Sequence, residues 1–172
     1  VFDGPGISHN SDYAVAAFQR IIANDPGAPE LERMLELLRE RADVRALITA
    51  ITDRLNWHEA EGHDLDNTVP LLLERATVLH GFGDQSAAMA DLDALLEQSP
   101  DNVEALRFRG DLAITGGDVE TAIAMWRRFL AAETRPSRRG EIELQLSQVL
   151  AENTGDIAGA IGRDIGDQVT AL

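Results

Sequence analysis

Apolar residues recur along this chain at intervals of three and four positions, the spacing of one face of an α-helix. The stretch ELERMLELLRERA illustrates this, because Leu31, Met34, Leu35 and Leu38 form one apolar stripe among charged residues. No stretch carries a convincing strand pattern. The sequence therefore predicts an all-α chain, with helices over about 12–25, 30–42, 44–57, 68–81, 85–98, 102–115, 118–132, 138–153 and 157–168.

One short phrase occurs three times between these expected helices. GDQSAAM begins at Gly83, GDVETAI at Gly117 and GDIAGAI at Gly155, with spacings of 34 and 38 residues. Glycine can end a helix with a positive φ, and the aspartate carboxylate can cap the next helix. The chain therefore repeats a helix-turn-helix unit. We expect the two helices to touch at the alanine of each copy: Ala88, Ala122 and Ala160.

A helix pair repeated every 34 residues resembles the tetratricopeptide repeat (TPR) family. The stretches 69–100 and 103–134 match in Leu72 and Leu106, Arg75 and Arg109, Ala76 and Gly110, Ala88 and Ala122, Leu92 and Trp126, and Leu95 and Phe129. Leu replaces the first Trp of the family pattern, Arg replaces the Leu before the small residue, and Thr134 replaces the last Pro of one copy. The resemblance implies a solenoid, or α-α superhelix, of antiparallel helix pairs, with about four hairpins and a partial N-terminal one. A generic stack of helical hairpins is the alternative fold.

The repeats suggest a domain organisation. Residues 1–10 are expected to form a disordered or loop segment, and 11–172 a single TPR-like array. Its parts are degenerate repeats over 11–56, a loop over 57–68, repeats over 69–102 and 103–136, and a C-terminal repeat over 141–172. Within the degenerate repeats, ADV at 42–44 occupies the position that GDV, the start of the repeated phrase, occupies at 117–119. Since the array begins with half a repeat and the chain without Met, we expect a fragment of a longer protein or a trimmed form.

The charge and the residue composition exclude some classes of binding partner and of metal site. The net charge is −15, from 15 basic residues, all Arg, and 30 acidic residues. An acidic surface repels phosphate backbones, which argues against nucleic-acid binding and favours a basic partner, if the charge does more than keep the chain in solution. There is no Cys, which excludes disulfides and thiolate metal sites. No apolar run reaches the roughly 18 residues of a membrane span and no signal pattern is visible, so we expect a cytoplasmic protein.

The search for catalytic chemistry yields three weak candidates. In WHEAEGHDLD, 57–66, His58 and His63 are five positions apart and not the four of a zinc-protease helix, so we interpret it as a polar loop. TGGD, 115–118, lacks the Lys of a phosphate loop. RPSRRG, 135–140, is interpreted as an exposed linker or a dock for an acidic peptide or phosphate. We predict no catalytic residue, no cofactor and no metal.

The family resemblance implies a function in protein binding. In TPR proteins the first helix of each pair lines a concave face that binds an extended peptide or a partner helix. Carried over to this chain, that face comprises Leu73, Thr77, His80, Arg107, Asp111, Ile114, Gln145, Val149 and Glu152. We therefore expect a non-catalytic protein-interaction scaffold, of a bacterial type. The alternatives are a regulatory or recruiting segment of a larger enzyme or sensor, and a structural element that self-assembles through the array ends.

Overall fold

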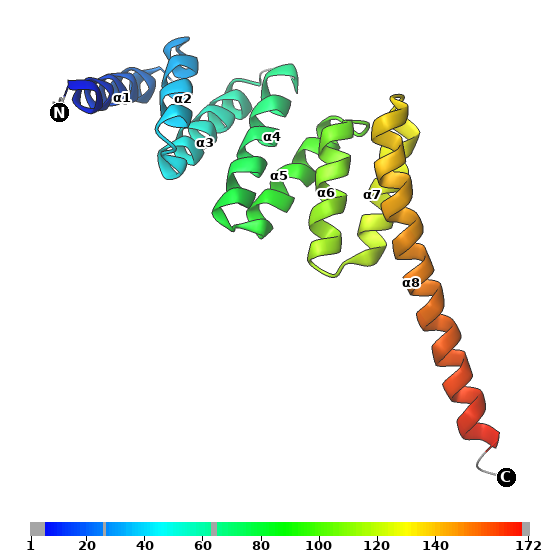
Figure 1. Cartoon of the computed structure of the whole chain (residues 1–172). Helices are drawn as coiled ribbons and strands as arrows, with labels where there is room; N and C mark the ends of the chain where they lie inside the picture. Colours follow the sequence, from blue (N-terminus) through cyan, green and yellow to red (C-terminus); the bar gives the residue numbers. More distant parts are fainter. Residues whose placement is uncertain (1–5, 26, 63–64, 170–172) are drawn as a thin grey trace. The chain divides into compact units, whose positions relative to one another are not determined.

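The computed structural model describes residues 6–25, 27–62 and 65–169, and the side chains within 13–25, 27–62 and 67–152. These residues form eight α-helices and contain no strand (Figure 1). The helices are α1 (Gly6–Asn24), α2 (Glu30–Glu40), α3 (Val44–Glu61), α4 (Leu65–Phe82), α5 (Gln85–Gln98), α6 (Val103–Thr115), α7 (Val119–Ala132) and α8 (Pro136–Val169). The predicted all-α class is confirmed. The chain divides into two compact units, Val1–Pro100 (unit 1) and Asp101–Leu172 (unit 2).

Unit 1 contains α1, the α2/α3 pair and the α4/α5 pair, and each helix packs on the next along the chain. The apolar stripe of α2 is buried, and its residues Leu31, Leu35 and Leu38 belong to one core cluster with Ile51 of α3. The amphipathic pattern of the sequence thus determines which face of α2 packs inward.

Unit 2 contains the α6/α7 pair, with α8 packed on α7. Its largest fully buried side chains are Trp126 and Phe129 of α7, Leu106 of α6 and Ile142 of α8. The C-terminal half of α8 extends away from the α6/α7 pair (Figure 1). Among the side chains of α8 that the structure describes, Ile142, near the start of the helix, is the buried one.

Three of the turns between paired helices share one backbone geometry. The residue after the first helix has a positive φ, which is 52° at Ala42, 93° at Gly83 and 83° at Gly117. The next N–H donates to the carbonyl five residues earlier, as from Asp84 to Leu79 at 2.9 Å. This is the hydrogen-bonded Schellman ending of a helix. The phrase therefore has the structural role that its glycine predicts, and Ala42 takes the same conformation.

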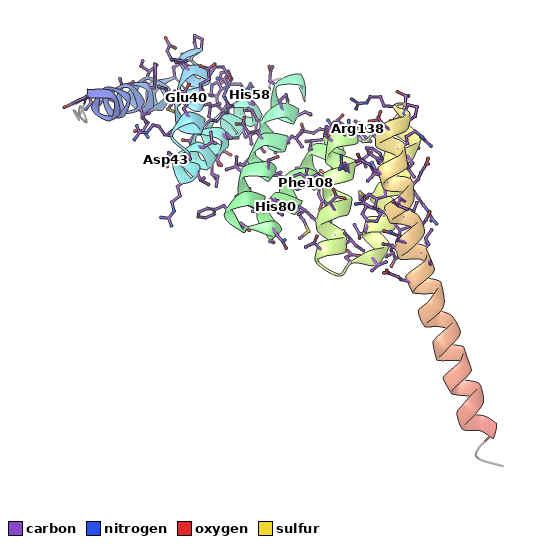
Figure 2. The ribbon with its side chains drawn as sticks, in the orientation of Figure 1. Glu40, Asp43, His58, His80, Phe108 and Arg138 are labelled. Carbon is purple, nitrogen blue, oxygen red and sulfur yellow. The ribbon has the colours of Figure 1, made fainter. Side chains whose placement is uncertain are left out.

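The aspartate of each turn caps the following helix, as predicted. Its carboxylate accepts a hydrogen bond from the backbone N–H three residues later: Asp43 from Ala46 at 3.2 Å, Asp84 from Ala87 at 3.0 Å and Asp118 from Thr121 at 3.0 Å. Figure 2 labels Asp43 at the turn between α2 and α3. Aligning these aspartates relates α2/α3 to α4/α5 by 41 positions and α4/α5 to α6/α7 by 34.

The alignment shows how the paired helices fit together. Two positions, one on each helix of a pair, are almost fully buried in all three pairs. They are occupied by Leu35 and Ile51, by Ala76 and Leu92, and by Gly110 and Trp126. From Ala76 and Leu92 to Gly110 and Trp126, the first residue becomes smaller as the second becomes larger. At Gly110 a Cβ atom would lie only 2.5 Å from Cδ1 of Trp126, so the indole requires glycine there.

The alanine of the phrase is less restrictive than the sequence suggests. Ala88 and Ala122 are fully buried, as expected at a helix contact. The equivalent position in α3 is Leu47, which is also buried. A larger side chain is thus accommodated in the α2/α3 pair. The side chain of Ala160 lies outside the described ones.

Two predicted boundaries in the N-terminal half of the chain are wrong. The first helix begins at Gly6, so residues 6–10 are not a loop; residues 1–5 lie outside the described ones. The helix α3 continues to Glu61, where Gly62 ends it with a φ of 67°, so the 57–68 loop is much shorter than predicted. Polar composition had suggested a loop, but polar residues are equally compatible with the exposed side of a helix.

The largest difference lies at the C-terminus. The predicted pair of helices over 141–172 is one helix of 34 residues, which continues through Gly155 and Asp156. Glycine costs about 1 kcal/mol relative to Ala inside a helix, which is tolerable. A Gly-Asp pair therefore permits a turn without requiring one. The described residues contain three helix pairs and single helices α1 and α8, instead of about four pairs.

Candidate functional site

The candidate residues of unit 1 lie on the exposed side of α4. Thr77 and His80 are exposed and Leu73 is partly buried. The Thr77 hydroxyl donates to the Leu73 carbonyl at 2.8 Å. Next to them, the guanidinium of Arg39 in α2 donates two hydrogen bonds, of 2.6 and 2.8 Å, to the Glu74 carboxylate. The exposed side of α4 thus offers polar groups beside a bidentate ion pair that joins it to α2.

The candidate residues of unit 2 include a charged cluster between α6 and α8. Arg107 lies 3.8 Å from the carboxylate of Asp111 and 3.3 Å from that of Glu141. The indole Nε1 of Trp126 donates to Asp111 at 3.2 Å. Burial raises the pKa of Asp111, although the bond from Trp126 and the charge of Arg107 act in the opposite direction. The cluster joins the exposed surface to the buried indole.

The other candidates of unit 2 lie on α6 and α8. Ile114 and Val149 are partly buried, whereas Gln145 and Glu152 are exposed. The apolar side chain of Leu144 in α8 is 62% exposed. The structure brings Arg107 and Asp111 together with Glu141, a residue that the sequence analysis did not select.

Residues 136–140 of the basic segment RPSRRG form the start of α8 and are not a linker, although most of the segment is exposed. Arg135 donates to the buried carboxylate of Glu133 at 2.8 and 3.0 Å, and Arg138 lies 3.2 Å from the same carboxylate. Arg138 also donates to Glu104 of α6 at 2.5 and 2.8 Å (Figure 2). Arg139 donates to the carbonyls of Leu130 and Glu133.

These contacts have an electrostatic consequence. The hydrogen bonds from Arg135, together with the positive charges of Arg135 and Arg138, lower the pKa of Glu133 to about 2. The three arginines therefore hold the start of α8 against α6 and α7, and their charges are engaged within unit 2.

The histidine-rich stretch has a different setting from the predicted loop. His58 is buried in α3, and its ring meets that of Trp57 edge-on with centroids 4.9 Å apart. Across the described residues, no three His, Cys, Asp or Glu side chains are grouped to hold a metal ion. His63 and Asp64 lie outside that range.

A buried ion pair joins three helices of unit 1. Arg75 of α4 donates to both carboxylate oxygens of Asp91 in α5, at 2.8 and 2.6 Å, and to the hydroxyl of Thr52 in α3 at 2.9 Å. The Asp91 side chain is only 8% exposed. Arg75 also lines a pocket of about 360 Å³ between α3, α4 and α5.

A larger pocket, of about 600 Å³, lies between α1, α2 and α3. Its lining residues are Gln19, Ile22, Ala23, Met34, Ala46, Thr49, Ala50, Asp53, Asn56 and Trp57. Volumes of this size and a mainly apolar lining are typical of binding pockets. The sequence analysis missed this pocket. Aligning Asp43 with Asp84 would have revealed a signal, because Met34 and Ala50 then occupy the positions of Arg75 and Asp91.

Solved structures identify the fold. A crystal structure of a tetratricopeptide repeat protein from Parabacteroides merdae matches with a TM-score of 0.65 and 19% identity, over 84% of this chain and 55% of that one. This chain has the tetratricopeptide-like fold. Two crystal structures of MamA also match it, with TM-scores of 0.58 and 0.59 and 12% identity. The first of these matches covers 92% of this chain and 99% of the MamA chain. The second covers 83% of this chain and 79% of the MamA chain.

The remaining comparisons add no closer relative. No family model matches the sequence, and neither does any curated protein. The chain spans about half the length of the Parabacteroides protein. None of the helices, as far as the structure describes them, is long and apolar enough to cross a bilayer.

Proposed function

We propose that the chain is a non-catalytic module that binds a peptide or partner protein on the exposed side of its first helices. This side is the concave face in tetratricopeptide arrays. The supporting observation is the cluster of Arg107, Asp111 and Glu141, which presents charged groups of both signs at a partly exposed surface. Such charges select partners and orient them more than they add affinity.

The test reverses charges without removing the ion pair. The double variant Arg107→Glu with Glu141→Arg keeps the net charge and the possibility of pairing, and presents the opposite polarity to a partner. The matched control is Arg33→Glu with Glu36→Arg, an exposed pair of α2 whose atoms lie 2.7 Å apart. The experiment is affinity capture from a lysate of the source organism, followed by binding measurements with each purified partner.

We expect the α6/α8 variant to lose at least ten-fold in binding to a specific partner, and the α2 control to bind as the original chain does. Equal binding by both variants would refute a partner site at Arg107. Circular dichroism checks that both variants remain helical. A partner that proves to be the catalytic domain of an enzyme or sensor would identify the chain as its recruiting segment.

A second candidate function is self-assembly. Apolar side chains are exposed on the helices at the two ends of the described chain: Tyr13 is 74% and Ile21 40% exposed in α1, and Leu144 is 62% exposed in α8. Light scattering over a concentration series tests this candidate. We expect association that weakens in Leu144→Glu; a monomer at all concentrations would exclude the candidate.

A further inference from the structure

The pocket between α1 and α3 combines an apolar floor with one acidic group. Ile22, Met34 and Ala50 are buried along its floor, and Trp57 forms part of its wall. Asp53 is exposed at its rim and is the one charged residue among the lining residues that the structure describes. A ligand that fits this lining therefore needs an apolar body and a cationic end.

The next repeat contains a side chain with these two properties. Three positions line both pockets when the repeats are aligned: Met34 with Arg75, Asp53 with Ala94, and Trp57 with Gln98. In the pocket between α3 and α5, the Arg75 side chain pairs with the carboxylate of Asp91. In the pocket between α1 and α3, neither that arginine nor that aspartate is present, and the carboxylate lies one helical turn further along, at Asp53.

We propose that this pocket binds an arginine or lysine side chain of a partner protein, with its aliphatic stem on Met34, Ala50 and Trp57 and its cation at Asp53. The incoming side chain takes the place that Arg75 has in the next repeat. Long basic side chains bury their stems on apolar surface while the charged end reaches a polar group.

Electrostatics and the aromatic wall support a cationic occupant. The net charge of −15 attracts basic segments and disfavours anionic ones. The Arg54 guanidinium lies 4.5 Å from the ring centroid of Trp57, which shows that this indole already stacks with one cation. The inference rests on the proposed function in that the partner is a protein. It places a contact on α1 and α3, two helices that contain none of the residues carried over from the family's groove.

The experiment measures small probes on the whole chain by NMR, following the indole N–H signal of Trp57. The probes are N-acetylarginine amide, N-acetylcitrulline amide, which has nearly the same shape without the charge, and the guanidinium ion, which has the charge without the stem. We expect the arginine probe to shift the signal saturably. The citrulline probe should bind about five-fold more weakly, because an exposed ion pair contributes at most about 1 kcal/mol. Guanidinium should leave the signal almost unchanged.

Two variants and a control locate the effect. Asp53→Asn should reduce arginine binding to the level of citrulline, whereas Asp93→Asn, the same change at an exposed site of α5, should have no effect. Met34→Arg with Ala50→Asp rebuilds the pair of the next repeat and should abolish the shift. Since this double variant changes buried residues, Asp53→Asn decides the test if the double variant fails to fold.

The proposal would be overturned if citrulline or guanidinium bound as well as arginine, or if Asp53→Asn bound arginine normally. These outcomes are independent of the partner site at Arg107. A chain that fails here but loses its partner in the Arg107→Glu and Glu141→Arg variant retains the proposed function. If the arginine probe binds as expected but the Arg107→Glu and Glu141→Arg variant keeps its partner, the partner site lies on α1 and α3 and not at Arg107.

Discussion

The helix pairs α4/α5 and α6/α7 have the same turn and different interiors. Their glycines have φ values of 93° and 83°, and their aspartates cap the next helix with bonds of 3.0 Å in both cases. Between the helices, Ala76 and Leu92 of one pair correspond to Gly110 and Trp126 of the other. The buried Asp91 of α5 corresponds to Met125 of α7.

The comparison separates two kinds of constraint. The turn needs a residue that tolerates positive φ and an oxygen acceptor next to it, and a few neighbouring residues satisfy both needs. The interior needs matching volumes and paired charges from two helices, which many residue combinations satisfy. The turns therefore repeat in the sequence, whereas the interiors vary together in pairs.

The largest expected effect comes from the buried ion pair. Asp91→Ala should lower the free energy of unfolding by about 3 kcal/mol, because it leaves the largely buried Arg75 without its carboxylate. The double variant Arg75→Met with Asp91→Ala gives α4/α5 the residues that α2/α3 has at these positions, Met34 and Ala50. It should lower the free energy of unfolding by less than about 1 kcal/mol. Urea denaturation of both variants measures the difference. If the double variant is as unstable as the single one, the α2/α3 interior is not a model for α4/α5.

The next effect concerns the size match in α6/α7. Gly110→Ala should cost about 1 kcal/mol: overpacking against Trp126 costs about 1–3 kcal/mol, and the better helix propensity of Ala returns about 1. In a Trp126→Leu background the same change rebuilds the α4/α5 interior and should instead stabilise. A double-mutant cycle followed by thermal unfolding measures whether the effect of Gly110→Ala on stability changes sign. Additive effects would show that the two residues do not constrain each other.

The shared turn predicts equal effects in the two pairs. Asp84→Ala and Asp118→Ala should each cost about 1 kcal/mol, because each removes the acceptor for one N–H of the following helix. Urea denaturation measures both, with the exposed Asp93→Ala as the control. Clearly unequal losses would mean that tertiary packing, and not the turn, determines the stability of these caps.

The α2/α3 turn differs from the other two only in lacking glycine. Ala42 has a φ of 52°, a conformation that costs about 1 kcal/mol for a residue with a Cβ atom. Ala42→Gly should therefore raise the free energy of unfolding by about 0.5–1 kcal/mol. The reverse changes, Gly83→Ala and Gly117→Ala, should lower it by similar amounts. A destabilised Ala42→Gly would contradict the shared geometry.

The last prediction compares the two units at acid pH and concerns Glu133, whose counterpart in unit 1 is Ser99. The folded pKa of Glu133 is about 2, below its ordinary value of 4.5. Its contribution to stability is thus fully present above pH 4.5 and is lost as the pH falls toward 2. Unfolding followed through Trp126 between pH 5 and 2 measures this loss, and Glu133→Gln should reduce the pH dependence. An unchanged pH profile in Glu133→Gln would assign the acid sensitivity to other carboxylates.

Much of the fold could be predicted from the sequence. Helix stripes and turn phrases depend on residues within about five positions of each other, so the sequence alone predicts the structural roles of Gly83, Asp84, Gly117 and Asp118. Even Ala42 could be placed, because ADV stands where GDV stands later. The candidate surface was predicted only by resemblance to the family, and its role in binding stays a prediction.

Other features required the tertiary structure. Whether Gly155 ends a helix depends on packing around it, since glycine is compatible with both a turn and a helix interior. Arg138 and Glu104 are 34 residues apart, and Arg75 and Asp91 are 16 apart. Such pairs form only where packed helices bring the side chains together, and a linear pattern does not encode that distance. The sequence by itself determined the repeated helix pair and its turns, because these are local. The tertiary structure alone decided the pocket, the ion pairs and the continuous α8, because these depend on the packing of whole helices.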